Sequence, residues 1–355
     1  MNVNTKELQT QLSRLVGVVH ARTTLPVLEC VLIHGGTLLA SNLDQYASTQ
    51  IRISGEEPVN TCVSCKRLLS IVKSMTGPEI TLKQDGTYLN ISSGDSKFRL
   101  PTINADEFPP APPLSGDEVT MPSESLRMGL ESVFRSASGD ESRFVMNGVL
   151  AEISGNQMQF VATDGRRLSK NGSMAEYKKQ AIMPNPTVGI LRGLLGEYEN
   201  VSLTMSERAV RFVFSSGEET FTLFSKLVEG KFPNWRQVIP KNTGDCYTLN
   251  RENLINAVRR VNLVGDKEIH MTLSFGDEML KVSKSTTEGD AEDTVSYPEK
   301  TPGGGGDISI KAEFLLDSIG SIPENNVTLE YRSELEPLLV KSGDILHVIM
   351  PVRKS

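Results

Sequence analysis

Cys62 and Cys65 are the residues whose spacing comes closest to a chemical motif in this chain. A CxxC pair can act as a redox dithiol or supply half of a zinc site. A structural zinc site needs two more ligands, and the sequence holds no second CxxC and no HxxxH. We therefore favour two partly buried thiols where a strand enters a helix, and we expect no metal and no cofactor. A thiol redox enzyme remains the alternative for this pair.

Other residues suited to acid–base chemistry form no constellation. The four histidines are scattered along the chain: His20, His34, His270 and His347. Asp164 could offer a carboxylate, but an Asp-Gly pair after a strand is typical of a turn. The GxSxG, HExxH, Walker A and dinucleotide-binding patterns do not occur in the sequence. We predict that the chain has no catalytic site of its own.

The composition fits a globular protein. The 355 residues are 38% hydrophobic and 23% charged, which is enough for a core in each of two or three domains. No apolar run is long enough to span a membrane, and the N-terminus lacks a signal-peptide core, so we expect a cytoplasmic protein without membrane contact. The net charge of −7 disfavours a uniformly basic surface. A protein that encloses DNA, however, needs positive charge only where it faces the duplex.

The elements that would position any functional residue recur three times. Apolar residues at i, i+4 and i+7 predict one amphipathic helix in each third of the chain: Leu8, Leu12 and Leu15; Leu126, Leu130 and Val133; Leu254, Val258 and Val261. A strand pattern recurs with a similar period at 79–82, 200–203 and 326–329. Repeats of this size indicate whole domains, and a chain of three similar domains is typical of a scaffold.

Each third also contains a hairpin and a second helix. Gly-containing turns separate strand-like segments near residues 35, 155 and 276, and second helices are predicted at 65–75, 186–195 and 312–322. Short strands without long crossovers favour antiparallel sheets with helices on one face, an α+β fold. Segments rich in turn-forming residues divide the chain into three predicted domains, residues 1–115, 116–243 and 244–355.

Basic residues recur on the polar faces of all six predicted helices and in the loop after the first. For any single helix, a solvated face is the simpler interpretation. Their recurrence on every helix instead indicates a positive surface that faces the DNA backbone. Such a surface would contact phosphates and therefore have no sequence preference. The candidate DNA-facing residues are Arg14, Arg22, Lys66, Arg67, Lys73, Arg127, Arg135, Arg192, Arg259, Arg260 and Lys311.

Several longer strings are family-specific. Thr24-Leu25-Pro26 follows the first helix, ATDGRRL occupies 162–168, FTLFSKLVEGKFPNWRQVIPKN occupies 221–242, and VIMPVR occupies 348–353. Together they resemble the beta subunit of bacterial replicative DNA polymerase, the sliding clamp, over essentially the whole chain. The resemblance implies three tandem clamp domains with antiparallel sheets outside and two helices per domain inside. It also implies a head-to-tail homodimer that closes a ring around duplex DNA and acts as a polymerase processivity factor.

The resemblance also implies a hydrophobic cleft between the second and third domains. There the replicative polymerase, the clamp loader and other replication or repair proteins would dock short peptides. Carried over by position, the cleft residues are Met146, Thr163, Gly165, Arg166, Arg167, Leu168, Pro233, Val238, Ile269, Phe314, Leu335, Val348, Met350, Pro351 and Val352. The dimer seam would pair Phe108 with Leu263 and Val264. An interaction scaffold of clamp fold that does not serve the main replicase is the alternative.

Overall fold

The structure, a computed structural model, describes residues 1–19, 23–55, 57–154, 157–173, 179–241, 244–266, 270–298 and 304–352. The chain falls into two compact units. One unit comprises residues 1–127 and 186–227, and the other comprises residues 128–185 and 228–355. Among the described residues, no helix has the length and apolar character needed to cross a membrane.

The predicted threefold repeat is confirmed by the order of elements. Each repeat runs strand, helix, four strands, helix, three strands, and the first repeat adds the short strand β5. The first contains β1 (Asn2–Asn4), α1 (Thr5–Leu15), β2 (Cys30–His34), β3 (Thr37–Ser41), β4 (Gln45–Gln50), β5 (Ile53–Ser54), β6 (Asn60–Ser64), α2 (Cys65–Ser74), β7 (Glu79–Asp85), β8 (Tyr88–Ser93) and β9 (Ser96–Asn104).

The second repeat contains β10 (Asp117–Pro122), α3 (Ser123–Val133), β11 (Gly148–Ser154), β12 (Gln157–Thr163), β13 (Arg167–Asn171), β14 (Lys179–Pro184), α4 (Asn185–Leu194), β15 (Asn200–Met205), β16 (Ala209–Ser216) and β17 (Glu219–Lys226). The third contains β18 (Asp245–Asn250), α5 (Arg251–Val261), β19 (Met271–Phe275), β20 (Met279–Thr286), β21 (Gly289–Ser296), β22 (Gly306–Ile310), α6 (Ala312–Gly320), β23 (Asn326–Tyr331), β24 (Leu338–Ser342) and β25 (Ile345–Ile349). The six predicted helices are present within about two residues of their expected positions.

The helices form where caps and apolar stripes coincide. The Asn4 side chain accepts hydrogen bonds from the backbone of Lys6 and Glu7 at 3.0 and 3.1 Å, which starts α1. Asn250 caps α5 in the same way, by accepting from the backbone of Asn253 at 3.0 Å. The apolar stripe of each of these helices is buried against a sheet, as the spacing predicted. The cap at Asn4 was not expected from the sequence.

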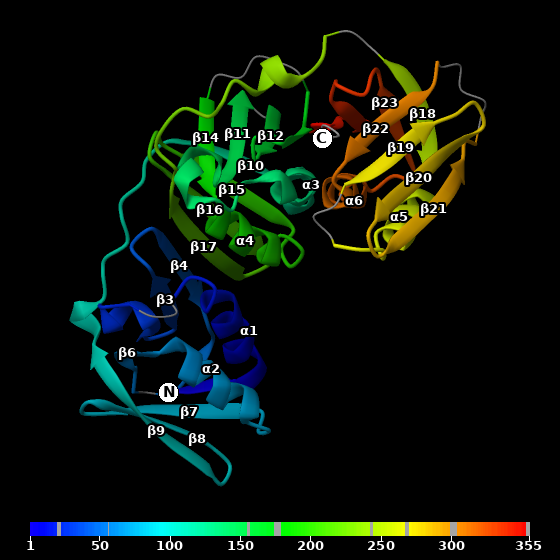
Figure 1. The fold of residues 1–355 in the computed structure, drawn as a ribbon. Coiled ribbons are helices and arrows are strands. Elements are labelled where there is room, and N and C mark those ends of the chain that lie inside the picture. The colour runs from blue at the N-terminus through cyan, green and yellow to red at the C-terminus, as the bar shows by residue number, and fades with distance from the viewer. Residues whose placement is uncertain are drawn as a thin grey trace. The chain divides into compact units, whose positions relative to one another are not determined.

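In the first unit, thirteen strands follow the order β10-β15-β16-β17-β4-β3-β2-β6-β9-β8-β7-β1-β5. Helices α1 and α2 contact each other, and α1 also contacts β4 (Figure 1). Strand β17 of the second repeat pairs antiparallel with β4 of the first, from Phe221 opposite Thr49 to Ser225 opposite Gln45. The sheet therefore continues from one repeat into the next.

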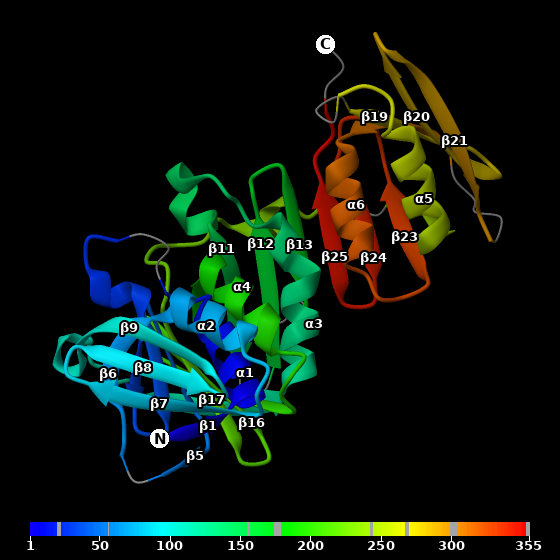
Figure 2. The ribbon, with the colours of Figure 1, turned by 90° about the horizontal axis from the view of Figure 1, so that it is seen from below.

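The second unit holds an eight-stranded sheet, β14-β11-β12-β13-β25-β24-β23-β18, and a four-stranded sheet, β21-β20-β19-β22. Figure 2 shows α5 and α6 side by side, and α6 contacts β25. Strand β13 of the second repeat pairs antiparallel with β25 of the third, from Arg167 opposite Ile349 to Asn171 opposite Ile345. Both units thus contain a sheet that crosses between repeats, while the domain boundaries at 115 and 243 stay a prediction.

Candidate functional site

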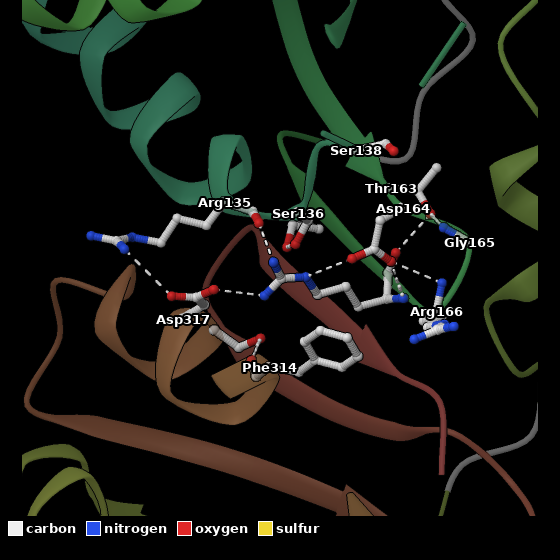
Figure 3. Close-up of polar contacts among 12 residues, drawn as sticks. Arg135, Ser136, Ser138, Thr163, Asp164, Gly165, Arg166, Phe314 and Asp317 are labelled. Carbon is white, nitrogen blue, oxygen red and sulfur yellow. Dashed lines mark hydrogen bonds and ion pairs between the residues drawn. The ribbon is translucent and has the colours of Figure 1, made fainter. Parts of the chain in front are cut away.

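The turn between β12 and β13 is held by its own side chains. Asp164 Oδ1 accepts hydrogen bonds from the backbone of Arg166 and Arg167 at 2.9 and 3.0 Å. The Thr163 hydroxyl accepts from the Gly165 amide at 3.1 Å and donates to the Arg167 carbonyl at 2.6 Å. Gly165 has a φ of +86°, a conformation that favours glycine. The sequence Thr-Asp-Gly therefore builds a turn that is held by hydrogen bonds of its own side chains, drawn in Figure 3.

Arg167 ties this turn to helix α6. Its Nε donates to Asp164 Oδ2 at 3.1 Å, and its Nη1 donates to Asp317 Oδ2 at 2.7 Å. Its Nη2 donates to the Arg135 carbonyl. The guanidinium carbon lies 4.5 Å from the centre of the Phe314 ring, within the range of a cation–π interaction. These contacts leave the Arg167 side chain only 9% exposed. Arg167 therefore connects the turn to α6 and offers little surface to a peptide.

An apolar surface lies beside the turn on strands β13 and β25. Leu168 and Val348 are direct cross-strand partners, so their side chains share one face of the sheet. Both are buried in a cluster with Trp235. The Met350 amide donates to the Arg166 carbonyl at 3.0 Å, while Met350 remains 42% exposed. An exposed methionine is thus held directly next to a buried apolar cluster.

The predicted cleft residues all belong to the second unit, but their exposure differs. The exposed ones are Gly165, Arg166, Pro233, Val238, Leu335 and Met350. The half-buried ones are Met146, Arg167, Pro351 and Val352, and the buried ones are Thr163, Leu168, Phe314 and Val348. Ile269 lies outside the described residues. Hydrogen bonds, strand pairing and ring contacts join the turn, Leu168, Val348, Met350 and Phe314 into one region.

Two residues of this region were not predicted. Asp317 binds Arg167, and Arg143 Nη1 donates to the Asp164 carbonyl at 2.8 Å. The sequence carried no signal for Asp317, because it is one of two acids on a helix 150 positions from Arg167. Arg143 lies in the 3₁₀ helix Glu141–Met146, just before the predicted Met146.

Comparisons with known proteins match the whole chain. Family models for the DNA polymerase III beta subunit match in order: the N-terminal domain at residues 1–112, the central domain at 120–234 and the C-terminal domain at 236–353. The chain belongs to the DNA polymerase III beta subunit family. A beta sliding clamp of Pseudomonas putida is 30% identical over 99% of both chains.

Solved structures of this beta subunit family share the fold. A Pseudomonas aeruginosa sliding clamp bound to griselimycin superposes with a TM-score of 0.91 at 27% identity, covering 100% of this chain and 99% of that one. A Bartonella birtlesii clamp bound to griselimycin gives the same TM-score, identity and coverage. The sequence-based assignment to the clamp family and its three-domain α+β fold are therefore confirmed.

Most of the candidate DNA-facing residues lie at the surface. Lys66, Arg67, Lys73, Arg135, Arg259 and Arg260 are exposed, and Arg127, Arg192 and Lys311 are half-buried. Some are engaged within the chain: Arg260 Nε lies 2.6 Å from Asp293 Oδ2, and Arg127 lies 2.5 Å from Glu124. Arg22 lies outside the described residues. The role of these residues stays a prediction.

Arg14, another predicted DNA contact, is bound by side chains of the first unit. Its side chain is 10% exposed and forms ion pairs with Glu219 and, at 2.7 Å, with Glu197. Its Nη1 also donates to the Tyr198 hydroxyl at 2.6 Å and to Gln11 at 3.0 Å. A guanidinium with these partners offers little to a phosphate. The geometry therefore makes Arg14 a link between α1 and the second repeat and weighs against a DNA contact, and its role at DNA stays a prediction.

The three candidate seam residues also differ in exposure. Leu263 is 82% exposed and Val264 is half-buried. Phe108 is only 8% exposed, because its ring packs edge-on against Tyr46 at 6.0 Å within the first unit. Leu263 therefore offers more apolar surface to a partner chain than Phe108, whose main contacts are internal.

A buried hydroxyl–imidazole chain lies next to the predicted cleft residues Leu168 and Val348. His347 Nδ1 lies 2.6 Å from the Ser169 hydroxyl, and His347 Nε2 lies 3.1 Å from the Ser321 hydroxyl. Ser169 in turn contacts the Ser136 hydroxyl at 2.6 Å. Burial, with a smaller contribution from the Arg167 charge, lowers the pKa of His347 to about 3. The imidazole is neutral at neutral pH and bonded at both nitrogens.

Because His347 is buried and neutral, we predict that the free energy of unfolding decreases in acid. Between pH 6.5 and pH 3, the unfolded chain protonates His347 and the folded chain does not, so stability falls as pH falls. The expected loss is about 1.4 kcal/mol per pH unit from this residue. Urea unfolding at pH 7, 6, 5 and 4 should show a shallower pH dependence for His347→Gln than for the natural chain. Parallel pH profiles for the two proteins would contradict the assignment.

The environment of the cysteines does not favour the redox alternative. Cys30, Cys62 and Cys65 are buried free thiols, and Cys246 is an exposed one. Burial raises the pKa of Cys62 and Cys65 to about 12, with the Cys30 charge adding to the rise. Since the thiolate is the reactive form, both thiols are unreactive at neutral pH. The described residues contain no cluster of His, Cys, Asp or Glu able to hold a metal.

Proposed function

We propose that the chain is a DNA polymerase processivity factor. Two copies form a head-to-tail ring around duplex DNA, and a hydrophobic cleft tethers the replicative polymerase. The observation that carries this proposal is the repeated strand join between domains, supported by the family match across the whole chain. The family match does not favour the alternative of a scaffold outside replication.

The strand joins indicate how the ring closes. Strand β4 of the first repeat pairs with β17, the last strand of the second, and β13 of the second pairs with β25, the last strand of the third. The third repeat's equivalent of β4 and β13 is β21, and the first repeat's equivalent of β17 and β25 is β9. Neither of these two strands takes part in a join between repeats. Within the described residues, β21 pairs only with β20, and residues 96–101 of β9 pair only with β8. Pairing β21 with β9 of a second copy, twice, gives a closed heterologous dimer.

The predicted seam residues fit this closure. Phe108 follows β9 by four residues. Val264 Cγ1 lies 3.7 Å from the position that a Cβ would take on Gly289, the first residue of β21. Sedimentation at micromolar concentration tests the proposal, because a dimer should have twice the mass of the 38.9 kDa chain. A monomer at that concentration would exclude a self-closing ring.

DNA contact in such a ring is weak and without sequence preference. Exposed basic side chains on helices attract phosphates, and the ring stays on the duplex by topology. This accounts for a modest number of basic residues in a chain with a net charge of −7. Retention on closed circular DNA together with release from the same DNA after linearisation would support enclosure; equal loss from both forms would argue against it.

The cleft is proposed to bind short peptides of the polymerase, the clamp loader and repair proteins. Support comes from the exposed Met350 beside the buried Leu168 and Val348. Methionine is flexible and polarisable, so it adapts to several apolar partners. The hydrogen-bonded turn at 163–167 supplies polar groups that would orient a peptide.

The cleft proposal predicts a selective loss in Met350→Ala. Truncation removes an exposed apolar side chain that would contact a Leu or Phe anchor, and we expect about tenfold weaker binding of a fluorescent peptide carrying such anchors. The native mass should not change. Met279→Ala serves as a matched control, because Met279 is 41% exposed on β20, outside the cleft. Equal affinity of Met350→Ala and the natural chain in an anisotropy titration would refute the cleft assignment.

A further inference from the structure

Asp317 bonds to two arginines that belong to different proposed surfaces. Its Oδ2 lies 2.7 Å from Arg167 Nη1, and its Oδ1 lies 3.4 Å from Arg135 Nη1 (Figure 3). Arg167 holds the turn beside the proposed peptide cleft, whereas Arg135 is a proposed DNA contact. One carboxylate on α6 therefore connects the two surfaces.

The two contacts of Asp317 are unequal. The Arg167 side chain is 9% exposed and is also bound by Asp164 and by the Phe314 ring. The Arg135 side chain is 57% exposed, and its contact with Asp317 is the longer one. Exposed ion pairs contribute little to stability, so the Arg135 contact is the one that a competing anion can displace.

Displacement of Arg135 from Asp317 changes how firmly Arg167 is held beside the turn. The Asp317 side chain is 20% exposed, so a carboxylate at this site is only partly screened by water. Arg135 and Arg167 both contact the Asp317 carboxylate, so their two positive charges lie close together and repel each other. Removal of Arg135 takes away the repulsion between the two guanidinium groups, so Arg167 is held more strongly at Asp317. Arg167 then holds Asp164 and Phe314 more firmly, and a better ordered turn loses less entropy when a peptide binds.

We propose that Asp317 couples DNA contact to peptide binding: a phosphate that engages Arg135 raises the affinity of the cleft for its peptides. This inference rests on the proposed function, because it needs both a peptide cleft and a DNA-facing Arg135. Linkage makes the effect reciprocal, so a bound peptide tightens DNA contact by the same factor. A clamp on DNA is then a better docking partner than a clamp free in solution.

The test measures peptide affinity by anisotropy, with the full chain and a fluorescent peptide carrying Leu and Phe anchors. A short linear duplex at low salt should raise the affinity of the natural chain about threefold. Arg135→Gln removes the competing cation, so this variant should bind the peptide about threefold more tightly without DNA and show no further response to the duplex. Asp317→Asn should also lose the response.

Arg259→Gln is the matched control. Arg259 is an exposed candidate DNA contact on α5, and its loss should weaken DNA binding while keeping the threefold response at saturating duplex. Peptide binding that ignores DNA, or a response that persists in Arg135→Gln, would overturn the coupling and leave the proposed function intact. Absence of peptide binding under every condition would overturn both. Because Arg135 is exposed, Arg135→Gln should fold even if Asp317→Asn does not.

Discussion

Leu263→Asp is expected to convert the dimer into monomers. Leu263 is 82% exposed in the single chain, the highest exposure among the large hydrophobic residues that the structure describes. Its neighbour Val264 lies against Gly289 of the edge strand β21, so we expect a chain that pairs with β21 to bury Leu263 as well. An aspartate in its place would be an unpaired charge in the closed seam, at a cost of several kcal/mol. Sedimentation equilibrium should then give the mass of one 38.9 kDa chain.

Leu43→Asp provides the control for this substitution. Leu43 is 47% exposed in the first unit and has a φ of +72°, a conformation that aspartate adopts more readily than leucine. We expect this variant to remain a dimer. A dimer of unchanged mass for Leu263→Asp would place the seam elsewhere. Retention on circular DNA should be lost together with the dimer, since an open monomer cannot enclose the duplex.

Arg14→Ala is expected to destabilise the first unit by about 2–3 kcal/mol. The substitution leaves Glu219, Glu197 and the Tyr198 hydroxyl without their common partner. Burial acts to raise the pKa of Glu219, but hydrogen bonds from Arg14 and Gln11 outweigh it and lower the pKa. The two carboxylates are partly exposed, which keeps the expected loss at the lower end for a broken buried pair. Urea unfolding of the two proteins measures the difference.

Arg52→Ala separates this effect from simple loss of charge. Arg52 lies in the same unit, is 81% exposed and pairs with the exposed Glu218 at 3.1 Å. Exposed pairs contribute little, so this variant should stay within about 0.5 kcal/mol of the natural chain. If Arg14→Ala were equally mild but weakened DNA binding, Arg14 would return to the DNA-facing set. Otherwise it is a structural residue of the link between α1 and the second repeat.

The sequence alone determined the repeating architecture. Helix stripes such as Leu8, Leu12 and Leu15 and the Gly-containing hairpins are local patterns, and local periodicity decides which face of an element is buried. The order of elements, the α+β fold and the family assignment followed from these patterns and from the strings at 162–168 and 221–242. Most predicted cleft residues of the turn and of β25 do lie together.

Only the tertiary structure decided the roles of the charged residues. Arg14 and Arg135 look alike in sequence, as basic residues near the end of a helix. Folding brings carboxylates from distant positions to Arg14 and buries it, whereas Arg135 stays exposed and shares Asp317 with Arg167. The energy of a charge depends on its partners and on its distance from water. Both are set by contacts between residues far apart in the chain, which a local pattern does not record.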